Sequence, residues 1–259
     1  MEITYIGGPT ALLEIGGLRI LTDPTFDPAG KRYWFGWGTQ SRKLQGPAIA
    51  PGDVGAIDAV LLSHDHHDDN LDATGRTLLP AARQVITTEA GAARLGANAL
   101  GLPPWASATV RGDDGFELRV TATPARHGPP FSKPIVGHVV GFVLQWEGQR
   151  NGAFWISGDS VWFNGLAEVG RRFDIGTAMV HLGGVRFPYL TGPARYTMNA
   201  TEAVRVARDF DVTTLVPIHY EGWKHFREGR DTVVRTFREH GIADRVRWLS
   251  AGEPVAIDA

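Results

Sequence analysis

The chain has 259 residues, of which 43% are hydrophobic and 21% are charged, a composition typical of a globular protein with a sizeable core. Its formal net charge of −2 argues against a general nucleic-acid binder, whose domain is usually basic. The chain has no cysteine, which excludes disulfides and thiolate metal sites, so any metal must be held by histidine and carboxylate side chains.

The first third of the chain is predicted to form strands. Short apolar runs at residues 3–6, 11–15 and 18–22 are separated by Gly-rich turns. The segment 24–55 is rich in Gly, Pro and aromatic residues and has no regular period, which indicates a long loop that is either functional or mobile. Residues 58–63 are then predicted to form a buried strand, and a cluster of histidines follows its end.

The rest of the chain alternates predicted strands with predicted helices. Further strands are expected at residues 84–87, 116–123, 139–146, 153–157, 176–180, 214–217, 246–249 and 255–257. Helices are expected at residues 89–95, 201–210 and 232–240. Early strands followed by strand–helix alternation predict two packed sheets with helices outside. No interdomain linker is evident, so residues 1–259 are expected to form a single domain.

The sequence also predicts where the protein resides. No apolar run approaches the ~18 residues that are needed to span a bilayer. Residues 1–5 lack the charged and apolar regions of a signal peptide. We therefore expect a cytoplasmic protein with no integral membrane segment.

The run from His64 to Asp69 consists of three histidines and three aspartates. Successive side chains of an extended chain point to opposite sides, so His64, His66 and Asp68 are expected to converge, and a turn would bring Asp69 back to them. Imidazole suits zinc and other transition metals, and carboxylate admits manganese or iron. A solvated polar turn is the alternative, and it fits poorly with a cluster that directly follows an apolar strand.

Five short motifs, in the same order, resemble those of the metallo-β-lactamase superfamily. The run His64-x-His66-x-Asp68-Asp69 is similar to the superfamily's metal motif H-x-H-x-D-H. Residues 123–127 (TPARH), 157–160 (SGDS) and 216–220 (VPIHY) resemble the segments with the third histidine, the bridging aspartate and the last histidine. Residues 4–8 (TYIGG) and 21–24 (LTDP) are similar to the branch of L-ascorbate-6-phosphate lactonase and N-acyl-phosphatidylethanolamine phospholipase D.

This resemblance implies an α+β fold, a four-layer αββα sandwich, in a single metallo-hydrolase domain. It also implies two divalent metal ions, with zinc expected and manganese or iron as alternatives. The implied ligands are His64, His66 and His127 for one ion, Asp68 and His219 for the other, and Asp159 as the bridge. Two such ions lower the pKa of a shared water towards 7, so that a metal-bound hydroxide attacks a small ester, lactone, amide or phosphodiester.

Three residues leave alternatives open. Asp69 stands where the superfamily's motif has a histidine; as a ligand it would favour Mn or Fe over Zn, and otherwise the enzyme would work with one ion. His181 follows an apolar run and is either a proton donor to the leaving group, an extra ligand or a hydrogen-bonded core histidine. Asp68, Asp159 and His181 are the expected catalytic residues. His67 is expected to lie outside the ligand set.

Other residues are assigned supporting roles. Asp23 is expected to orient a metal-ligating histidine. The aromatic segment 32–37 is expected to form an apolar lid or substrate wall. His225 is expected to be structural, although it is close enough in sequence to His219 to reach the rim of the site.

The leading hypothesis is a hydrolase with a small-molecule substrate and no nucleic-acid partner. The lactonase resemblance favours a phosphorylated or sugar-like substrate, and the phospholipase resemblance a lipid-like one. Iron-dependent redox chemistry and a non-catalytic metal-binding protein are the alternatives. A nuclease fits less well, because the chain has neither the inserted domain nor the basic charge of that branch. Relatives often form symmetric assemblies, so a homo-oligomer is one option.

Overall fold

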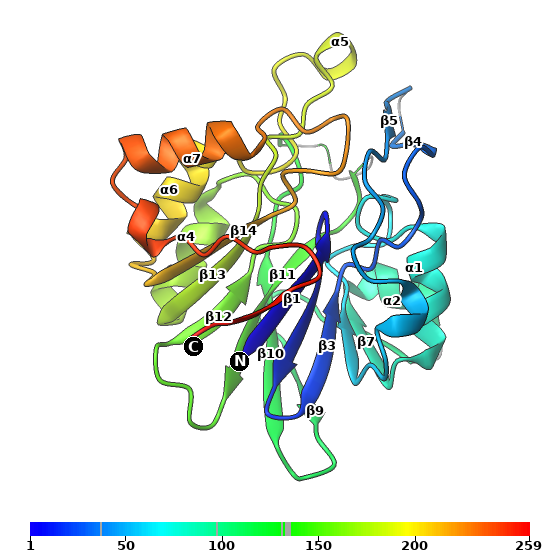
Figure 1. Cartoon of the computed structure of the whole chain (residues 1–259), viewed down its shortest axis with the longest axis vertical. Helices are drawn as coiled ribbons and strands as arrows, with labels where there is room; N and C mark the ends of the chain where they lie inside the picture. Colours follow the sequence, from blue (N-terminus) through cyan, green and yellow to red (C-terminus); the bar gives the residue numbers. More distant parts are fainter. Residues whose placement is uncertain (37, 97, 131, 133–135) are drawn as a thin grey trace.

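Two mixed β-sheets form the centre of the molecule (Figure 1). The computed structural model describes residues 1–36, 38–96, 98–130, 132 and 136–259. The first sheet has the order β15-β1-β2-β3-β6-β7-β8. Its strands are β1 (Glu2–Gly7), β2 (Thr10–Ile15), β3 (Leu18–Thr22), β6 (Ala59–Leu61), β7 (Gln84–Thr87), β8 (Ala99–Gly101) and β15 (Pro254–Ala256).

The second sheet has the order β14-β13-β12-β11-β10-β9. Its strands are β9 (Ser107–Arg111), β10 (Glu117–Pro124), β11 (Val140–Trp146), β12 (Ala153–Ile156), β13 (Ile175–His181) and β14 (Thr214–Ile218). Strands β12, β13 and β14 run parallel to one another, so their carboxyl ends lie at the same edge of the sheet. In the first sheet β3, β6, β7 and β8 are likewise parallel.

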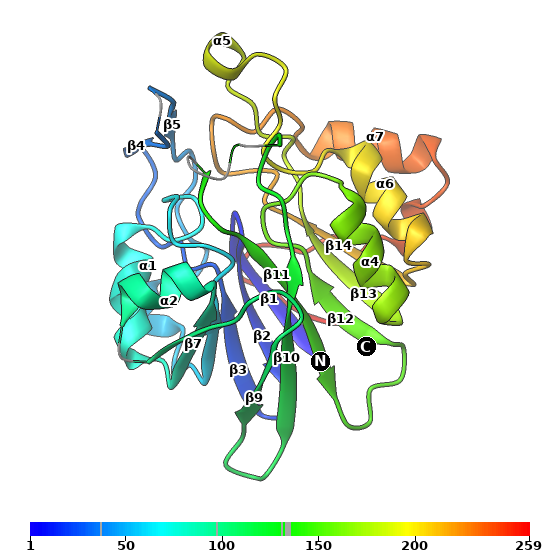
Figure 2. The ribbon, with the colours of Figure 1, turned by 180° about the vertical axis from the view of Figure 1, so that it is seen from behind.

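Helices cover the outer face of each sheet. Figure 1 shows α1 (Ala73–Leu78) and α2 (Glu89–Leu95) beside the first sheet, and Figure 2 shows α4 (Asn164–Arg172), α6 (Ala200–Asp209) and α7 (Arg230–Glu239) over the second. The side chains between the sheets form one apolar cluster, which includes Leu13 and Phe142. Two further clusters join each sheet to its helices. The predicted four-layer αββα arrangement is therefore confirmed.

Sequence signals explain helix α6, which is expected at residues 201–210 and observed at Ala200–Asp209. In α6, Ala203, Val204 and Ala207 are buried at helical spacing, as the sequence predicts. The helix begins with a capping box, in which Asn199 accepts a hydrogen bond from the backbone N–H of Glu202, and Glu202 accepts one from Asn199 N. Burial and capping thus agree on the same boundaries.

Some elements differ from the sequence-based expectation. The strand expected at residues 246–249 is absent; Val246 forms only an isolated bridge with Leu215. Helices α1 and α4 are not expected from the sequence; only Gly75 is buried in α1, and only Leu166 and Val169 are buried in α4. Within the expected loop 24–55, a hairpin forms from β4 (Arg32–Trp34) and β5 (Gln40–Arg42). Trp37 of the expected aromatic lid lies outside the described residues.

The loops that carry the predicted site lie at one end of the molecule. The β4–β5 hairpin and α5 (Pro188–Thr191) project there, beyond the carboxyl ends of the parallel strands (Figure 1). Both chain termini lie at the opposite end. Of the helices that the structure describes, none is long and apolar enough to cross a bilayer.

Candidate metal centre

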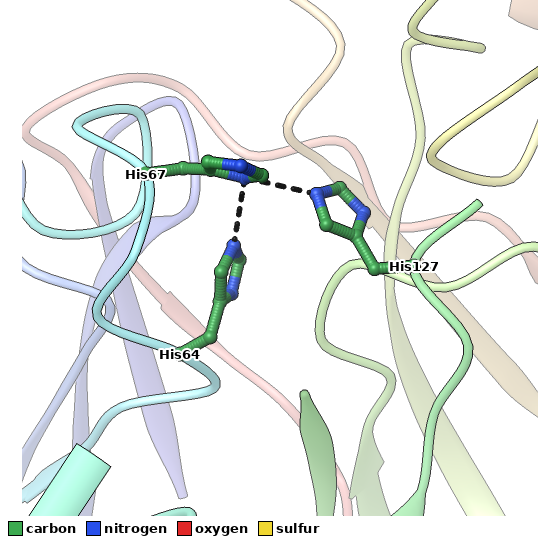
Figure 3. Close-up of side chains that lie close together, drawn as sticks. All are labelled: His64, His67 and His127. Atoms are coloured by element: carbon green, nitrogen blue, oxygen red, sulfur yellow. Dashed lines mark hydrogen bonds between the residues drawn. The ribbon is translucent and has the colours of Figure 1, made fainter. Parts of the chain in front are cut away.

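Three histidines converge where the loop after β6 meets the loop after β10. His67 Nδ1 lies 3.3 Å from His64 Nε2 and 3.0 Å from His127 Nε2 (Figure 3). The three side chains are buried. His64 and His67 follow β6 of the first sheet, and His127 follows β10 of the second sheet. This group therefore joins the two sheets.

The backbone fixes the orientation of these rings. His127 Nδ1–H donates to the carbonyl oxygen of Tyr196 at 2.7 Å, which leaves a lone pair on Nε2 because a neutral imidazole has one N–H. His64 Nδ1 hydrogen-bonds Ser63 Oγ at 3.0 Å, so its Nε2 is the atom that faces the other two rings. The contacts behind the rings therefore turn one ring nitrogen of each towards a common point.

Burial keeps two of these rings neutral. It lowers the pKa of His67 to about 3, and it holds the pKa of His64 well below its usual value, with further lowering by the neighbouring His127 and His67 rings. Neutral imidazole is the form that binds a transition metal. The first group therefore fits a cation such as zinc.

A second group forms at the carboxyl ends of β12, β13 and β14. Asp159 Oδ1 lies 2.9 Å from His181 Nδ1 and 3.3 Å from His219 Nδ1, and all three side chains are fully buried. Both ring nitrogens of His219 and Nε2 of His181 have no hydrogen-bond partner. Because buried polar atoms are normally hydrogen-bonded, nitrogens that lack a partner fit a bound cation.

Asp69 lies between the second group and His225. Its Oδ2 is 3.7 Å from His219 Nε2 and accepts a hydrogen bond from His225 Nε2 at 3.0 Å. Burial alone would raise the pKa of Asp69, but the hydrogen bond from His225 and the neighbouring imidazoles lower it below its usual value. Since Nε2 of His225 carries the proton, its Nδ1 accepts from the Ser41 hydroxyl at 2.6 Å.

Two buried carboxyls, Asp159 in the second group and Asp23 behind it, are costly to ionise without a cation. Burial raises the pKa of both Asp159 and Asp23 to about 7. Asp23 accepts from the backbone N–H of Ser63 at 2.6 Å and from Asn70 Nδ2 at 3.3 Å, and its Oδ2 lies 3.9 Å from His181 Nε2. Asp23 and His219 also have positive φ angles of 30° and 57°. Such strain outside glycine is concentrated at functional sites.

A cavity of about 310 Å³ opens onto both groups. His67, His127, Asp69, Asp159 and His225 line it, whereas His64, His181 and His219 are not among its lining residues. Its other walls come from the hairpin, the segment after His127 and the region of α5.

The structure brings together most, but not all, of the residues expected from the sequence. Of the predicted ligands, His64 and His127 meet in the first group, and Asp159, His219 and Asp69 meet in or beside the second.

Two predicted ligands lie elsewhere. His66 has 30% of its side chain exposed, and its ring packs on Gly137 near Arg94. Asp68 is half-buried, belongs to neither group and does not line the cavity; burial, followed by the charge of Asp69, raises its pKa.

The reason for this difference is that the chain does not stay extended after His64. The backbone bends at Asp65 and His66, so the alternation of side chains is broken before His67. His67 therefore takes the position expected for His66. A signal was available, because His67-x-Asp69-Asn70 matches the H-x-D-H half of the superfamily motif with Asn in the last place. With one residue more between His64 and His67 than the motif has between its first two histidines, the remaining positions align with the motif.

Comparisons with known proteins identify the family of the chain. The model of the family described as beta-lactamase superfamily domain matches residues 18–220. The chain belongs to the metallo-β-lactamase superfamily. A relative from Pyrobaculum aerophilum, named a UPF0173 metal-dependent hydrolase, is 27% identical over 85% of this chain and 84% of its own length. The prediction of this family is therefore confirmed. The general prediction of a metal-dependent hydrolase is confirmed as well.

Two solved structures share the superfamily fold. The isothiocyanate hydrolase from Delia radicum gut bacteria superposes with a TM-score of 0.81, at 22% identity and over all of both chains. CmlA, a diiron beta-hydroxylase from Streptomyces venezuelae, superposes with a TM-score of 0.69 at 12% identity, over 99% of this chain and 54% of its own. At these identities the likeness establishes the fold of this superfamily member, and its chemistry must be argued from its own site.

Proposed function

We propose that this protein is a hydrolase that holds one divalent ion on His64, His67 and His127 and a second on Asp159, His181 and His219. The observation that carries the proposal is the pair of buried groups, each with three donor atoms within 4.8 Å of one another. The buried nitrogens of His181 and His219 that lack a hydrogen-bond partner support the second ion. Asp69 is the additional carboxylate of the second group.

The donor set favours zinc. Five of the six residues in the two groups are histidines, and imidazole suits zinc, copper, iron and nickel better than magnesium or calcium. When bound, a pair of such ions would polarise the bond under attack and lower the pKa of water, which is the chemistry that hydrolysis needs.

The chain's own residues orient the site and move protons. The Tyr196 carbonyl fixes His127, and Asp159 lies against both His181 and His219. His225 lines the cavity, and its Nε2–H donates to Asp69 Oδ2, so a proton can be held between these two atoms beside the reacting group.

Two earlier assignments change in this proposal. Because His181 is fully buried and does not line the cavity, its role as an extra ligand is favoured over proton donation to a leaving group. Asp68 has no part in the proposed catalysis, because it lies outside both groups and outside the cavity lining.

The test is metal analysis followed by turnover. Protein purified without added metal would be analysed by mass spectrometry, stripped with chelator and reloaded with zinc, manganese or iron. Each form would then be assayed with esters, lactones, amides and phosphodiesters. We expect up to two ions per chain and metal-dependent hydrolysis; protein that binds no ion, or hydrolyses none of these bonds in any metal form, contradicts the proposal.

Iron-dependent redox chemistry is the second candidate. It is supported by the fold shared with the diiron beta-hydroxylase and by the ability of imidazole and carboxylate to bind iron. Oxygen consumption by the iron-loaded protein, without hydrolysis by the zinc-loaded protein, would favour it.

We propose that residues 1–259 act as one metallo-hydrolase unit. The first sheet supports this extent, because β1 and β15, from the two ends of the chain, pair within it. The small-molecule substrate, the cytoplasmic location and the homo-oligomer expected from the sequence stay predictions.

A further inference from the structure

The cavity beside the metal centre has one polar end and otherwise apolar walls. His67, His127, Asp69 and Asp159 form the polar end. Apolar side chains form most of the remaining walls; they include those of Phe35, Pro129, Val136, Val185, Phe187 and Leu190. Of the described residues that line the cavity, none is lysine or arginine, and the only carboxylates are those of Asp69 and Asp159.

Apart from the Tyr196 phenol, the hydroxyl groups of the described residues that line the cavity are hydrogen-bonded within the protein. Thr39 Oγ donates to the Gly36 carbonyl at 2.5 Å. Ser132 Oγ lies 2.8 Å from the Pro129 carbonyl and Thr191 Oγ lies 3.2 Å from the Phe187 carbonyl, so each also donates to the backbone. These groups therefore have no proton to offer to a ligand.

Four cationic side chains among the described residues line a different groove. Arg32, Arg42, Lys224 and Arg227 surround it. Phe187 and His225 line both the groove and the cavity, and their rings stack with centroids 5.6 Å apart and planes at 21°. This ring pair is therefore a shared wall, and the cationic side chains lie on its far side from the metal centre.

The walls decide which ligand is stable in the cavity. A charged group away from the metals would lose its hydration without meeting an oppositely charged side chain among the described lining residues, which is costly. An apolar group gains free energy on leaving water for the same walls. The volume of about 310 Å³ is at the small end of the ~300–1,000 Å³ range of ligand pockets.

We infer that the substrate is a small molecule whose non-reacting part is uncharged and apolar. For the bond that reacts, the inference rests on the proposed function. For the rest of the substrate, it rests on the walls of the cavity. Among the substrates that the sequence left open, a phosphorylated sugar fits these walls poorly, because the described residues of the walls offer its phosphate no cation.

A matched pair of ligands tests the inference without requiring turnover. Hexanamide and the monoamide of adipic acid have the same chain length. The end opposite the amide is a methyl group in hexanamide and a carboxylate in the monoamide. Calorimetric titration of the zinc-loaded protein should give at least 10-fold tighter binding of hexanamide. The corresponding 4-nitrophenyl esters, corrected for their hydrolysis in buffer, should show the same order in kcat/KM.

Two neighbouring residues of α5 provide the matched variants. Leu190 lines the cavity and is 58% exposed, whereas Tyr189 is 100% exposed and does not line it. Leu190→Arg places a cation in the cavity lining. It should reduce the ratio of the Kd for the carboxylate to the Kd for hexanamide by about 10-fold. Tyr189→Arg adds the same charge one residue away and should leave the preference unchanged.

The outcomes separate this inference from the proposed hydrolysis. Equal or tighter binding of the carboxylate by the wild type, or no binding of either amide, would overturn the inference, as would an equal effect of the two arginine variants. A preference for hexanamide without hydrolysis of any ester, lactone, amide or phosphodiester would support the substrate class and contradict the hydrolase.

Discussion

At the scale of single residues, His66 and His67 are neighbours in the sequence with opposite environments. His67 is buried with its Nδ1 against His64 and His127, while His66 is partly exposed against Gly137. A Cβ on Gly137 would lie 2.3 Å from the His66 ring, so glycine is needed for this packing. The two histidines therefore offer a direct test of the ligand assignment.

We expect His67→Ala to lose the ion of the first group and His66→Ala to keep it. Loss of a residue that only supports a metal ligand costs roughly 10–100-fold in affinity or activity, and loss of the ligand itself should cost more. Metal content and kcat/KM of both variants would be measured side by side. The assignment is wrong if His66→Ala is the variant that loses the ion.

Asp69 and Asn70 are also neighbours whose replacement by histidine should have opposite effects. Asn70 occupies the last place of the realigned motif, and its Oδ1 is buried without a partner. Asn70→His would restore a nitrogen donor there, so zinc affinity of the second group should rise by about 10-fold relative to manganese.

Asp69→His would instead remove the acceptor of the His225 hydrogen bond and weaken the second group. Zinc and manganese would be titrated into the metal-free form of each variant, and folding would be checked by circular dichroism. Equal zinc affinities in two folded variants would refute the realigned motif.

At the scale of elements, one buried carboxylate attaches the β4–β5 hairpin to α1. Asp72 accepts from the backbone N–H groups of Phe26, Asp27 and Gly75 and from Lys43 Nζ, at 2.9, 2.6, 2.8 and 2.9 Å. Both charged side chains are buried, with 0% and 4% exposed. Lys43 follows β5, so this ion pair holds the hairpin whose Phe35 lines the cavity.

We expect Asp72→Ala to lower the free energy of unfolding by about 3–5 kcal/mol, because it leaves the charge of Lys43 buried and unpaired. Thr88→Ala is the control, since Thr88 only caps α2 by accepting from Gly91 N, and its loss should cost about 1 kcal/mol. Urea unfolding of both variants measures the difference. Equal costs would mean that the ion pair adds nothing beyond a helix cap.

At the scale of the whole molecule, the metal groups connect the two sheets. In the first group, His64 and His67 lie in the loop after β6 of the first sheet, and His127 lies in the loop after β10 of the second sheet. An ion bound there would therefore join the two sheets. A ligand that binds only the folded state stabilises it in proportion to the logarithm of its concentration over Kd.

Removal of metal should therefore lower the melting temperature. At an ion concentration of 1,000 times Kd the stabilisation is about 4 kcal/mol, which corresponds to a shift on the order of 10 °C for a chain of this size. Calorimetry of the chelator-treated and zinc-loaded forms measures the shift. His127→Ala should lose a large part of it, and His240→Ala, at the end of α7, should retain it in full. A shift that survives in His127→Ala would place the ion elsewhere.

The sequence by itself determined the layers of this protein and the segments that carry its site. Strands such as β1 and β13 are apolar runs bounded by turn residues, and their local pattern is enough to predict them. The motifs at His64, His127, Asp159 and His219 each follow a predicted strand, and the carboxyl ends of parallel strands share an edge. Their order along the chain therefore predicts the region in which they meet.

The tertiary structure alone decided which of the clustered side chains face one another. The choice of His67 over His66 depends on a backbone bend at residues 65–66, and on the room that Gly137 leaves for the other ring. The contact of Asp69 with His225, and of His225 with Ser41, joins residues that are 156 and 184 positions apart. Such contacts are set by how the two sheets pack, and that packing has no signature in the local pattern from which the strands were predicted.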